Sequence, residues 1–274
     1  IIRNYFMARH KVIRSLRLAR KEKKKKLRKG IFSALLSVVA LAGAVYGFSR
    51  PMFRITEIDV SGSSRVPEAS VIEAVKQGIA GTYLGFIPKA HTLLYPKAAL
   101  KEELAKAFPV FSKVSISLGS LAALRIAVRE REPQALWCAG VHSCFLVDET
   151  GFVFAPSEMG AEKLYYRLEK EATSTPLGTE VISADRLAAG IAFLEELEKL
   201  GFNPERMLFQ REMDVEVFLS WNTRLLLKEG DYTRALSNLQ ILLAEGDVLP
   251  GTVASPEVDY IDLRYGNKIY FKPR

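Results

Sequence analysis

IFSALLSVVALAGAVYGF, residues Ile31–Phe48, is a run of eighteen residues that contains no charge, no proline and no histidine. As one α-helix this run is about 27 Å long, close to the thickness of the hydrocarbon core of a bilayer. A core helix is rarely apolar on every face at this length, and a signal peptide has a shorter apolar region. The run therefore predicts an uncleaved transmembrane helix over residues 31–49.

The charges of the chain are divided unevenly on the two sides of this stretch. Residues 1–29 contain thirteen Lys or Arg and one acid, Glu22, a net charge of +12, whereas residues 50–274 have a net charge of −4. Basic segments beside a transmembrane helix stay in the cytoplasm. Residues 1–30 are therefore expected to be a basic cytoplasmic tail, and everything after Arg50 is expected to lie outside the cytoplasm.

The formal net charge of +8 suggests nucleic-acid binding, but it comes from the tail alone. Attraction of the basic segment to anionic lipid, about 1 kcal/mol for each charge near the surface, is a sufficient explanation. We therefore expect no nucleic-acid partner. Because the first residue is Ile1, a longer cytoplasmic segment is compatible with the sequence.

Residues 53–130 alternate between strand-like and helix-like patterns. A strand at 53–60 is followed by a helix from Pro67 to about Gly78, a helix over 96–107, and strands at 114–118 and 124–130. Apolar residues recur at helical spacing in the two helices and at alternate positions in the strands. The order β-α-α-β-β predicts a sheet with helices on one face.

Four motifs, taken in order, resemble a known family. They are FRITEIDVSG at residues 53–62, VREREPQALW at 128–137, FLVDETGFVF at 145–154 and VDYIDLRY at 258–265. With the uncharged stretch before them, they resemble the bacterial cell-division proteins FtsQ and DivIB. The resemblance implies a POTRA domain over residues 53–130 and an FtsQ/DivIB-type β domain over residues 131–274. The turn usual in the family between the last two POTRA strands is replaced here by Leu118-Gly-Ser-Leu121.

The second predicted domain is rich in strands and has two helices. Ser183 is a suitable N-cap for a helix that ends at Leu200, and Asp231 for a helix that ends before Gly246. The last two strands form a hairpin over Tyr265-Gly-Asn267. The predicted class is therefore α+β: a single N-terminal transmembrane helix, a POTRA domain, and a β-rich mixed domain with two helices.

A search for catalytic or cofactor-binding patterns finds none. His10, His91 and His142 have no acidic residue at metal-ligand spacing, and no nucleophile elbow or phosphate-binding loop is present. The pair Asp148-Glu149 lies at a turn before Gly151, where Asp is favoured for turn geometry alone. Glu130, Arg131 and Glu132 are interpreted as a solvated junction. We expect no enzyme activity, no cofactor and no metal.

Cys138 and Cys144 are the only cysteines of the chain. Six residues apart, they could bind a metal together with His142. The two ends of a hairpin in an oxidising compartment favour a disulfide instead.

The resemblance implies a membrane scaffold of the division machinery at the septum of the cytoplasmic membrane. Its implied partners are FtsB/DivIC-like and FtsL-like coiled-coil proteins and, through them, the septal peptidoglycan synthase. One alternative is a POTRA-bearing receptor for membrane-protein assembly or transport, although that class generally ends in a membrane barrel. An anchored cell-wall hydrolase is another alternative, supported only by scattered carboxylates.

The last strand is the candidate partner-binding edge. Ile269 and Phe271 alternate with Tyr270, while Lys268 and Lys272 discourage self-pairing. An extended partner segment would add to this edge through main-chain hydrogen bonds. The candidate residues are Tyr260, Lys268, Ile269, Tyr270 and Phe271. Without the resemblance, an ordinary protected edge is the simpler interpretation.

Overall fold

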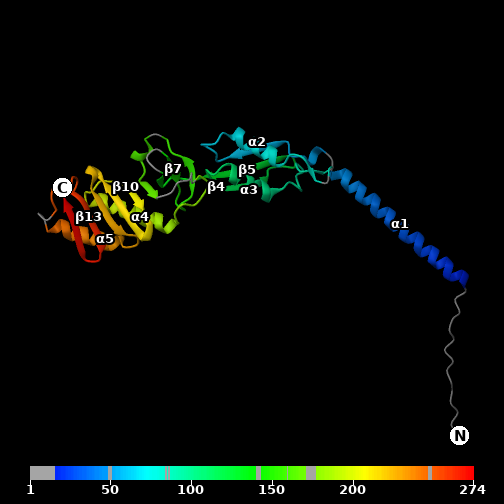
Figure 1. Ribbon diagram of the computed structural model, residues 1–274. Helices are drawn as coiled ribbons and strands as arrows, with labels where there is room; N and C mark the ends of the chain where they lie inside the picture. The colour runs from blue at the N-terminus through cyan, green and yellow to red at the C-terminus, as the bar shows by residue number, and fades with distance from the viewer. Residues whose placement is uncertain are drawn as a thin grey trace, which may run out of the picture. The chain divides into compact units, whose positions relative to one another are not determined.

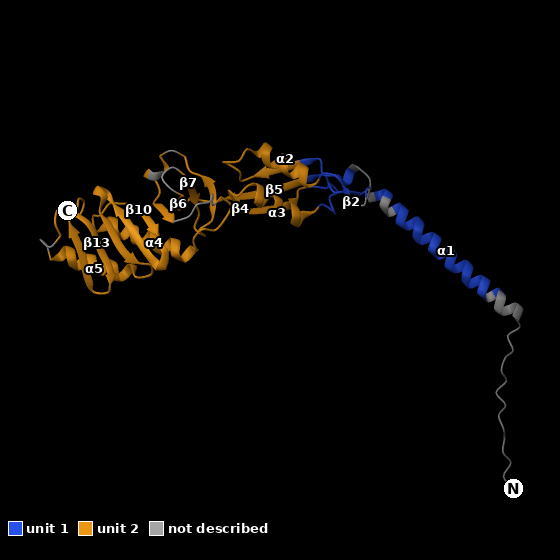
Figure 2. Ribbon diagram, viewed as in Figure 1, with its two compact units in different colours: residues 1–57, 80–95, 120–123 blue, residues 58–79, 96–119, 124–274 orange. Residues whose placement is uncertain are grey.

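The computed structural model describes residues 16–48, 51–83, 85, 87–139, 143–158, 160–170, 177–245 and 249–274 (Figure 1). The chain divides into two compact units (Figure 2). The first unit contains residues 1–57, 80–95 and 120–123, and the second contains residues 58–79, 96–119 and 124–274. The described residues are α+β, with five α-helices and a large sheet, and to this extent they agree with the predicted class.

The first helix corrects the prediction made for the uncharged stretch. It is one helix of 33 residues, α1 (Leu16–Phe48), which also contains the lysine-rich residues 21–29. No helix among the described residues is long and apolar enough to cross a membrane, so the predicted transmembrane helix over residues 31–49 is wrong. The uncharged stretch is only the second part of this helix, whose first part carries the lysines and arginines of residues 17–29.

The first unit also contains three short elements that follow α1 in the sequence. These are a 3-10 turn, η1 (Pro51–Phe53), and a two-stranded sheet of β2 (Thr82–Tyr83) and β3 (Ile87–Pro88). Arg54 forms a bridge with His91, and the N–H of Ile55 donates to the carbonyl of Ala90. Because residues 54 and 55 bond to this segment, the predicted strand at 53–60 begins late, at Glu57.

The next elements form a three-stranded sheet with two helices, in the predicted chain order β-α-α-β-β. The short strands β2 and β3, which were not predicted, lie between the two helices in the sequence. The strand order of the three-stranded sheet is β1-β5-β4, and β4 pairs antiparallel with β5. Val71, Val75, Leu100 and Leu104 are the buried residues of the two helices. The elements are β1 (Glu57–Ser61), α2 (Glu68–Gly78), α3 (Lys97–Ala107), β4 (Phe111–Leu118) and β5 (Ala123–Glu130).

The rest of the second unit is built on one sheet of nine strands. The strand order is β14-β13-β12-β11-β10-β9-β6-β7-β8, so β14 and β8 are its two edges. The strands are β6 (Ala135–Cys138), β7 (Cys144–Val147), β8 (Val153–Pro156), β9 (Arg167–Lys170), β10 (Pro204–Phe209), β11 (Asp214–Leu219), β12 (Arg224–Lys228), β13 (Val258–Tyr265) and β14 (Lys268–Pro273).

Two helices connect parallel neighbours of this sheet. α4 (Ala184–Lys199) lies between the parallel strands β9 and β10, and α5 (Tyr232–Ala244) lies between the parallel strands β12 and β13. Figure 1 shows both helices along the sheet, and the rings of Phe193 and Tyr232 lie 5.0 Å apart where the helices meet. Their apolar faces bury one core with the sheet, to which Ile269 and Phe271 of β14 contribute partly buried side chains.

Candidate functional site

β14 is an edge strand whose side chains alternate between core and solvent. Within the described residues it pairs with β13 alone. Ile269 and Phe271 pack on the core, whereas Lys268, Tyr270 and Lys272 are exposed. An edge of this kind leaves one row of main-chain N–H and C=O groups unpaired in the sheet. The structure therefore places Lys268, Ile269, Tyr270 and Phe271 on one free edge, with two faces of different chemistry.

Tyr260 lies beside this edge on the neighbouring strand. It stands opposite Lys272 in the register of β13 with β14, and it is partly exposed. Lys272 forms an ion pair of 2.7 Å with Asp259, which raises the pKa of the lysine. Lys268 forms no ion pair with any described residue. The uncompensated positive charge of the edge is therefore at Lys268.

A network of charges lies at the end of the sheet where β13 turns into β14. Arg264 bonds Asp262 at 2.6 Å and Asp214 at 3.1 Å, and Asp214 also pairs with Lys228 at 2.5 Å. Burial opposes the charge of Asp214, but the hydrogen bonds from Lys228 and Arg264 outweigh it and lower its pKa. The network links side chains of the three neighbouring strands β11, β12 and β13 beside the edge strand.

The rings of Tyr265 and Tyr270 meet edge to face at this same end. Their centroids are 5.5 Å apart, and both residues are about half exposed, Tyr265 at 58% and Tyr270 at 49%. Exposed aromatic side chains of this type supply much of the contact energy in protein interfaces. Tyr265 was absent from the predicted site, although it flanks the predicted hairpin turn.

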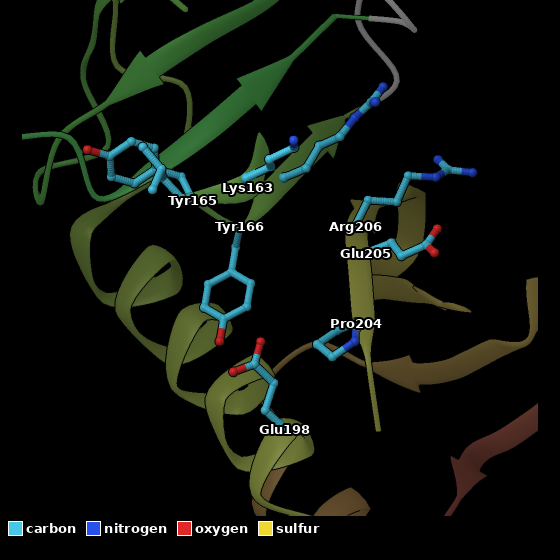
Figure 3. Close-up of a pocket in the computed structure, with 9 residues that line it drawn as sticks. Lys163, Tyr165, Tyr166, Glu198, Pro204, Glu205 and Arg206 are labelled. Carbon is cyan, nitrogen blue, oxygen red and sulfur yellow. The ribbon is translucent and has the colours of Figure 1, made fainter. Parts of the chain in front are cut away.

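A second candidate is an open pocket of about 690 Å³ beside the parallel strands β9 and β10. Its lining comes from the turn before β9, the end of α4 and the start of β10. Figure 3 shows the hydroxyl of Tyr166 directed toward Glu198 at one end, with Lys163 and Arg206 away from that end. Arg206 bonds Glu169 at 2.7 Å and lies over the ring of Phe218.

Three ionisable side chains that line the pocket, Tyr166, Arg167 and Arg206, each bind an acidic side chain. Burial, together with the hydrogen bond to Glu198, raises the pKa of Tyr166 to about 12, so this hydroxyl stays protonated and donates. Glu169 accepts a hydrogen bond from Arg206 and forms an ion pair with Arg167. None of these interactions joins a nucleophile to a general base. The pocket was not predicted, because its residues come from three separate segments.

Arg131, just after β5, connects the three-stranded sheet to the nine-stranded sheet. Its backbone N–H donates to the carbonyl of Val110 and its Nε to that of Pro109. Its Nη1 forms an ion pair with Asp148, and its guanidinium lies 4.1 Å from the ring centre of Phe152. The side chains of Arg131 and Asp148 are only 17% and 6% exposed. The interpretation of Arg131 as part of a solvated junction is therefore wrong.

Glu130, the residue before Arg131, and Asp148 itself make further structural hydrogen bonds. Glu130 accepts the backbone N–H groups of Ser64 and Arg65 at 2.6 and 2.8 Å. Asp148 also accepts from Thr150 and from the N–H of Phe152. Burial opposes its charge, but the hydrogen bonds from Thr150 and Arg131 outweigh it and lower the pKa of Asp148. Asp148 is a turn-forming residue and an ion-pair partner.

Cys138 and Cys144 form a disulfide across the hairpin of β6 and β7. They stand directly opposite one another in the register, with their Cα atoms 4.0 Å apart. Next to them, the N–H of Ala139 donates to the carbonyl of Ser143. His142, which the sequence offered as a metal ligand with the cysteines, lies outside the described residues, as does His10.

Loss of the disulfide is expected to weaken the fold without abolishing it. Closing a loop this small removes little entropy from the unfolded chain, so replacing both cysteines by serine should lower the free energy of unfolding by ~2–3 kcal/mol. Urea denaturation followed by circular dichroism measures the change. Mass spectrometry of the non-reduced wild-type protein should find no free thiol. Two free thiols would contradict the bond.

Neither a metal site nor a similarity to a known protein adds a further candidate functional site. Among the described residues, no three His, Cys, Asp or Glu side chains gather closely enough to hold a metal ion. The sequence matches no model of a known protein family and no curated protein. The edge at β14 and the pocket beside β9 are therefore the two candidate functional surfaces.

Proposed function

We propose that the protein is a non-enzymatic binding protein of the bacterial division machinery, which captures an extended segment of a partner at β14. The observation that carries this proposal is the free edge: unpaired main-chain groups lie between exposed Lys268 and Tyr270 on one face and apolar Ile269 and Phe271 on the other. Strand addition uses these two features, because main-chain bonds give affinity and alternate side chains give selectivity.

The class of partner is suggested by the charge at the edge and by the four motifs that resemble FtsQ and DivIB. The unpaired charge of Lys268 favours an acidic residue in the incoming strand. The resemblance supports an FtsB/DivIC-like coiled-coil protein as the direct partner, together with an FtsL-like protein. Through them the chain would act on the septal peptidoglycan synthase.

We infer that the folded region works outside the cytoplasm, at the division septum. The disulfide between Cys138 and Cys144 supports this location, because disulfides persist in oxidising compartments and are rare in the cytosol. Binding rather than catalysis is supported by the ion pairs that Glu169, beside the pocket, and Asp148, at the junction, form with arginines.

The proposal is tested by capture of the FtsB/DivIC-like protein of the same organism. The variants Tyr270→Ala and Lys268→Glu remove an aromatic contact and reverse a charge on the exposed face of β14. Each should weaken capture by about tenfold or more, as truncation of an interface hot spot does. Because both side chains are exposed, the thermal midpoint should stay unchanged.

Two substitutions elsewhere serve as matched controls. Lys113→Glu reverses an exposed charge on β4, an edge of the three-stranded sheet, and Leu164→Ala removes a side chain that is 77% exposed at the pocket. Both should capture the partner normally. Normal capture by the two β14 variants would overturn the proposal, and a loss caused by Lys113→Glu would place the binding face on β4.

A further inference from the structure

The turn between β11 and β12 holds a large aromatic residue in an unfavourable backbone conformation. Trp221 has φ 65° and ψ 21°, and the next residue, Asn222, has φ 61°. This left-handed region is accessible to glycine and is tolerated by asparagine, but it is costly for other L-residues. Non-glycine residues kept in this region are a reason to look for a function.

The indole of Trp221 has no visible role in the turn itself. The turn is closed by a bond from the N–H of Leu219 to the carbonyl of Thr223, and the N–H of Ser220 donates to the carbonyl of Asn203. Trp221 is 66% exposed, and within the described ranges its ring makes no hydrogen bond and no ring contact. The side chain therefore faces solvent from a position that would favour Gly or Asn.

A second turn of the same kind shows that the geometry does not require an aromatic residue. Between β10 and β11, Glu212 has φ 59° and ψ 29° and is followed by Met213 with φ 64°. There the N–H of Gln210 donates to the carbonyl of Asp214, the same closure as in the other turn. Glu212 thus occupies the position of Trp221, and it provides a matched control.

The Trp221 turn is tied to the end of the edge strand. The guanidinium of Arg274, the residue after β14, donates to the carbonyl of Trp221 and, at 3.2 Å, to the hydroxyl of Thr223. The backbone N–H of Arg274 donates to the carbonyl of Glu257 beside β13. The turn and the end of β14 are therefore parts of one connected surface.

We propose that Trp221 is a second contact for the partner that adds to β14, where it receives an apolar side chain of that partner. Pro273 has no N–H, so a ladder of main-chain bonds along β14 ends there and the added chain leaves the sheet at this end. The released segment passes the Arg274 contact and packs on the indole. This inference rests on the proposed function and specifies the part of the partner that lies outside the strand.

The test replaces Trp221 and its counterpart by the residue that the backbone favours. Trp221→Asn should raise the thermal midpoint by about 2–4 °C, because the left-handed strain is relieved. The same variant should weaken capture of the FtsB/DivIC-like protein about tenfold. Glu212→Asn should raise the midpoint similarly and leave capture unchanged. Trp221→Tyr, which retains an aromatic ring, should recover most of the capture.

The outcomes separate this inference from the proposed function. Normal capture by Trp221→Asn together with weak capture by Tyr270→Ala would overturn the role of Trp221 and leave the β14 edge standing. Normal capture by both variants would overturn both proposals. A lower midpoint for Trp221→Asn would show that the indole supports the fold, and loss of a self-associated species would assign the indole to a second copy of this chain. Either of the last two results would also overturn the inference.

Discussion

Replacing Arg131 by alanine is expected to lower the free energy of unfolding by ~3–5 kcal/mol. The substitution leaves the carboxylate of Asp148, whose side chain is only 6% exposed, without its ion-pair partner. Removing one partner of a buried pair has an effect of this size because a buried charge remains uncompensated. It also removes the bond to Pro109 and the contact with the ring of Phe152. Urea denaturation at neutral pH measures the loss.

The control is Arg129→Ala, which removes an exposed arginine from β5, two residues before Arg131, and should change the free energy by less than about 0.5 kcal/mol. Combining Arg131→Ala with Asp148→Ala should be less harmful than the sum of the two. Because the pKa of Asp148 is lowered in the folded state, its contribution is complete above its ordinary pKa and is lost as pH falls through the lower, folded value. An effect of Arg131→Ala no larger than that of Arg129→Ala would contradict the role given to this residue.

Replacing Gly151 by alanine is expected to be the second most damaging change, with a loss of about 3 kcal/mol or more. Gly151 has φ +81° in the turn after Asp148, and an added Cβ would lie 1.7 Å from the carbonyl oxygen of Ile182. That oxygen belongs to the backbone before α4, so relieving the clash requires the chain to move. Thermal denaturation or the yield of folded protein measures the effect.

Gly230→Ala isolates the clash from the backbone strain. Gly230 has a similar φ of +88°, but an added Cβ there meets no atom within 4 Å. This variant should cost only the left-handed strain, about 1–2 kcal/mol. Equal losses at the two glycines would show that the contact with Ile182 is not decisive.

Local patterns predicted many of the elements, because their causes are local. Val71 and Val75 recur at helical spacing and are buried in α2, and Ile269, Tyr270 and Phe271 alternate as predicted in β14. The strand order of the nine-stranded sheet could not be predicted, because its parallel pairs join β6 to β9 and β9 to β10 across long intervening segments. The membrane prediction was based on the uncharged stretch alone, whereas α1 also contains the lysine-rich residues 21–29.

Residues of the candidate site were predictable only where the chain places them together. Lys268–Phe271 form one strand, so their shared edge followed from the alternation. The ion pair of Arg131 with Asp148 could not be predicted from the sequence, because it forms only when the turn at Asp148 packs beside the end of β5. Trp221 could not be singled out from the sequence, because its left-handed backbone and its link to Arg274 exist only in the fold.

The most direct test of the central claim is amide hydrogen exchange of the folded protein with and without the FtsB/DivIC-like partner. If the partner adds a strand to β14, amides of residues 268–272 that exchange with solvent in the free protein become bonded and should slow by about tenfold or more. Amides of β8, the opposite edge of the sheet, should exchange at the same rate in both states. Unchanged exchange along β14, with protection at β4 or at the pocket beside β9, would contradict strand addition at this edge.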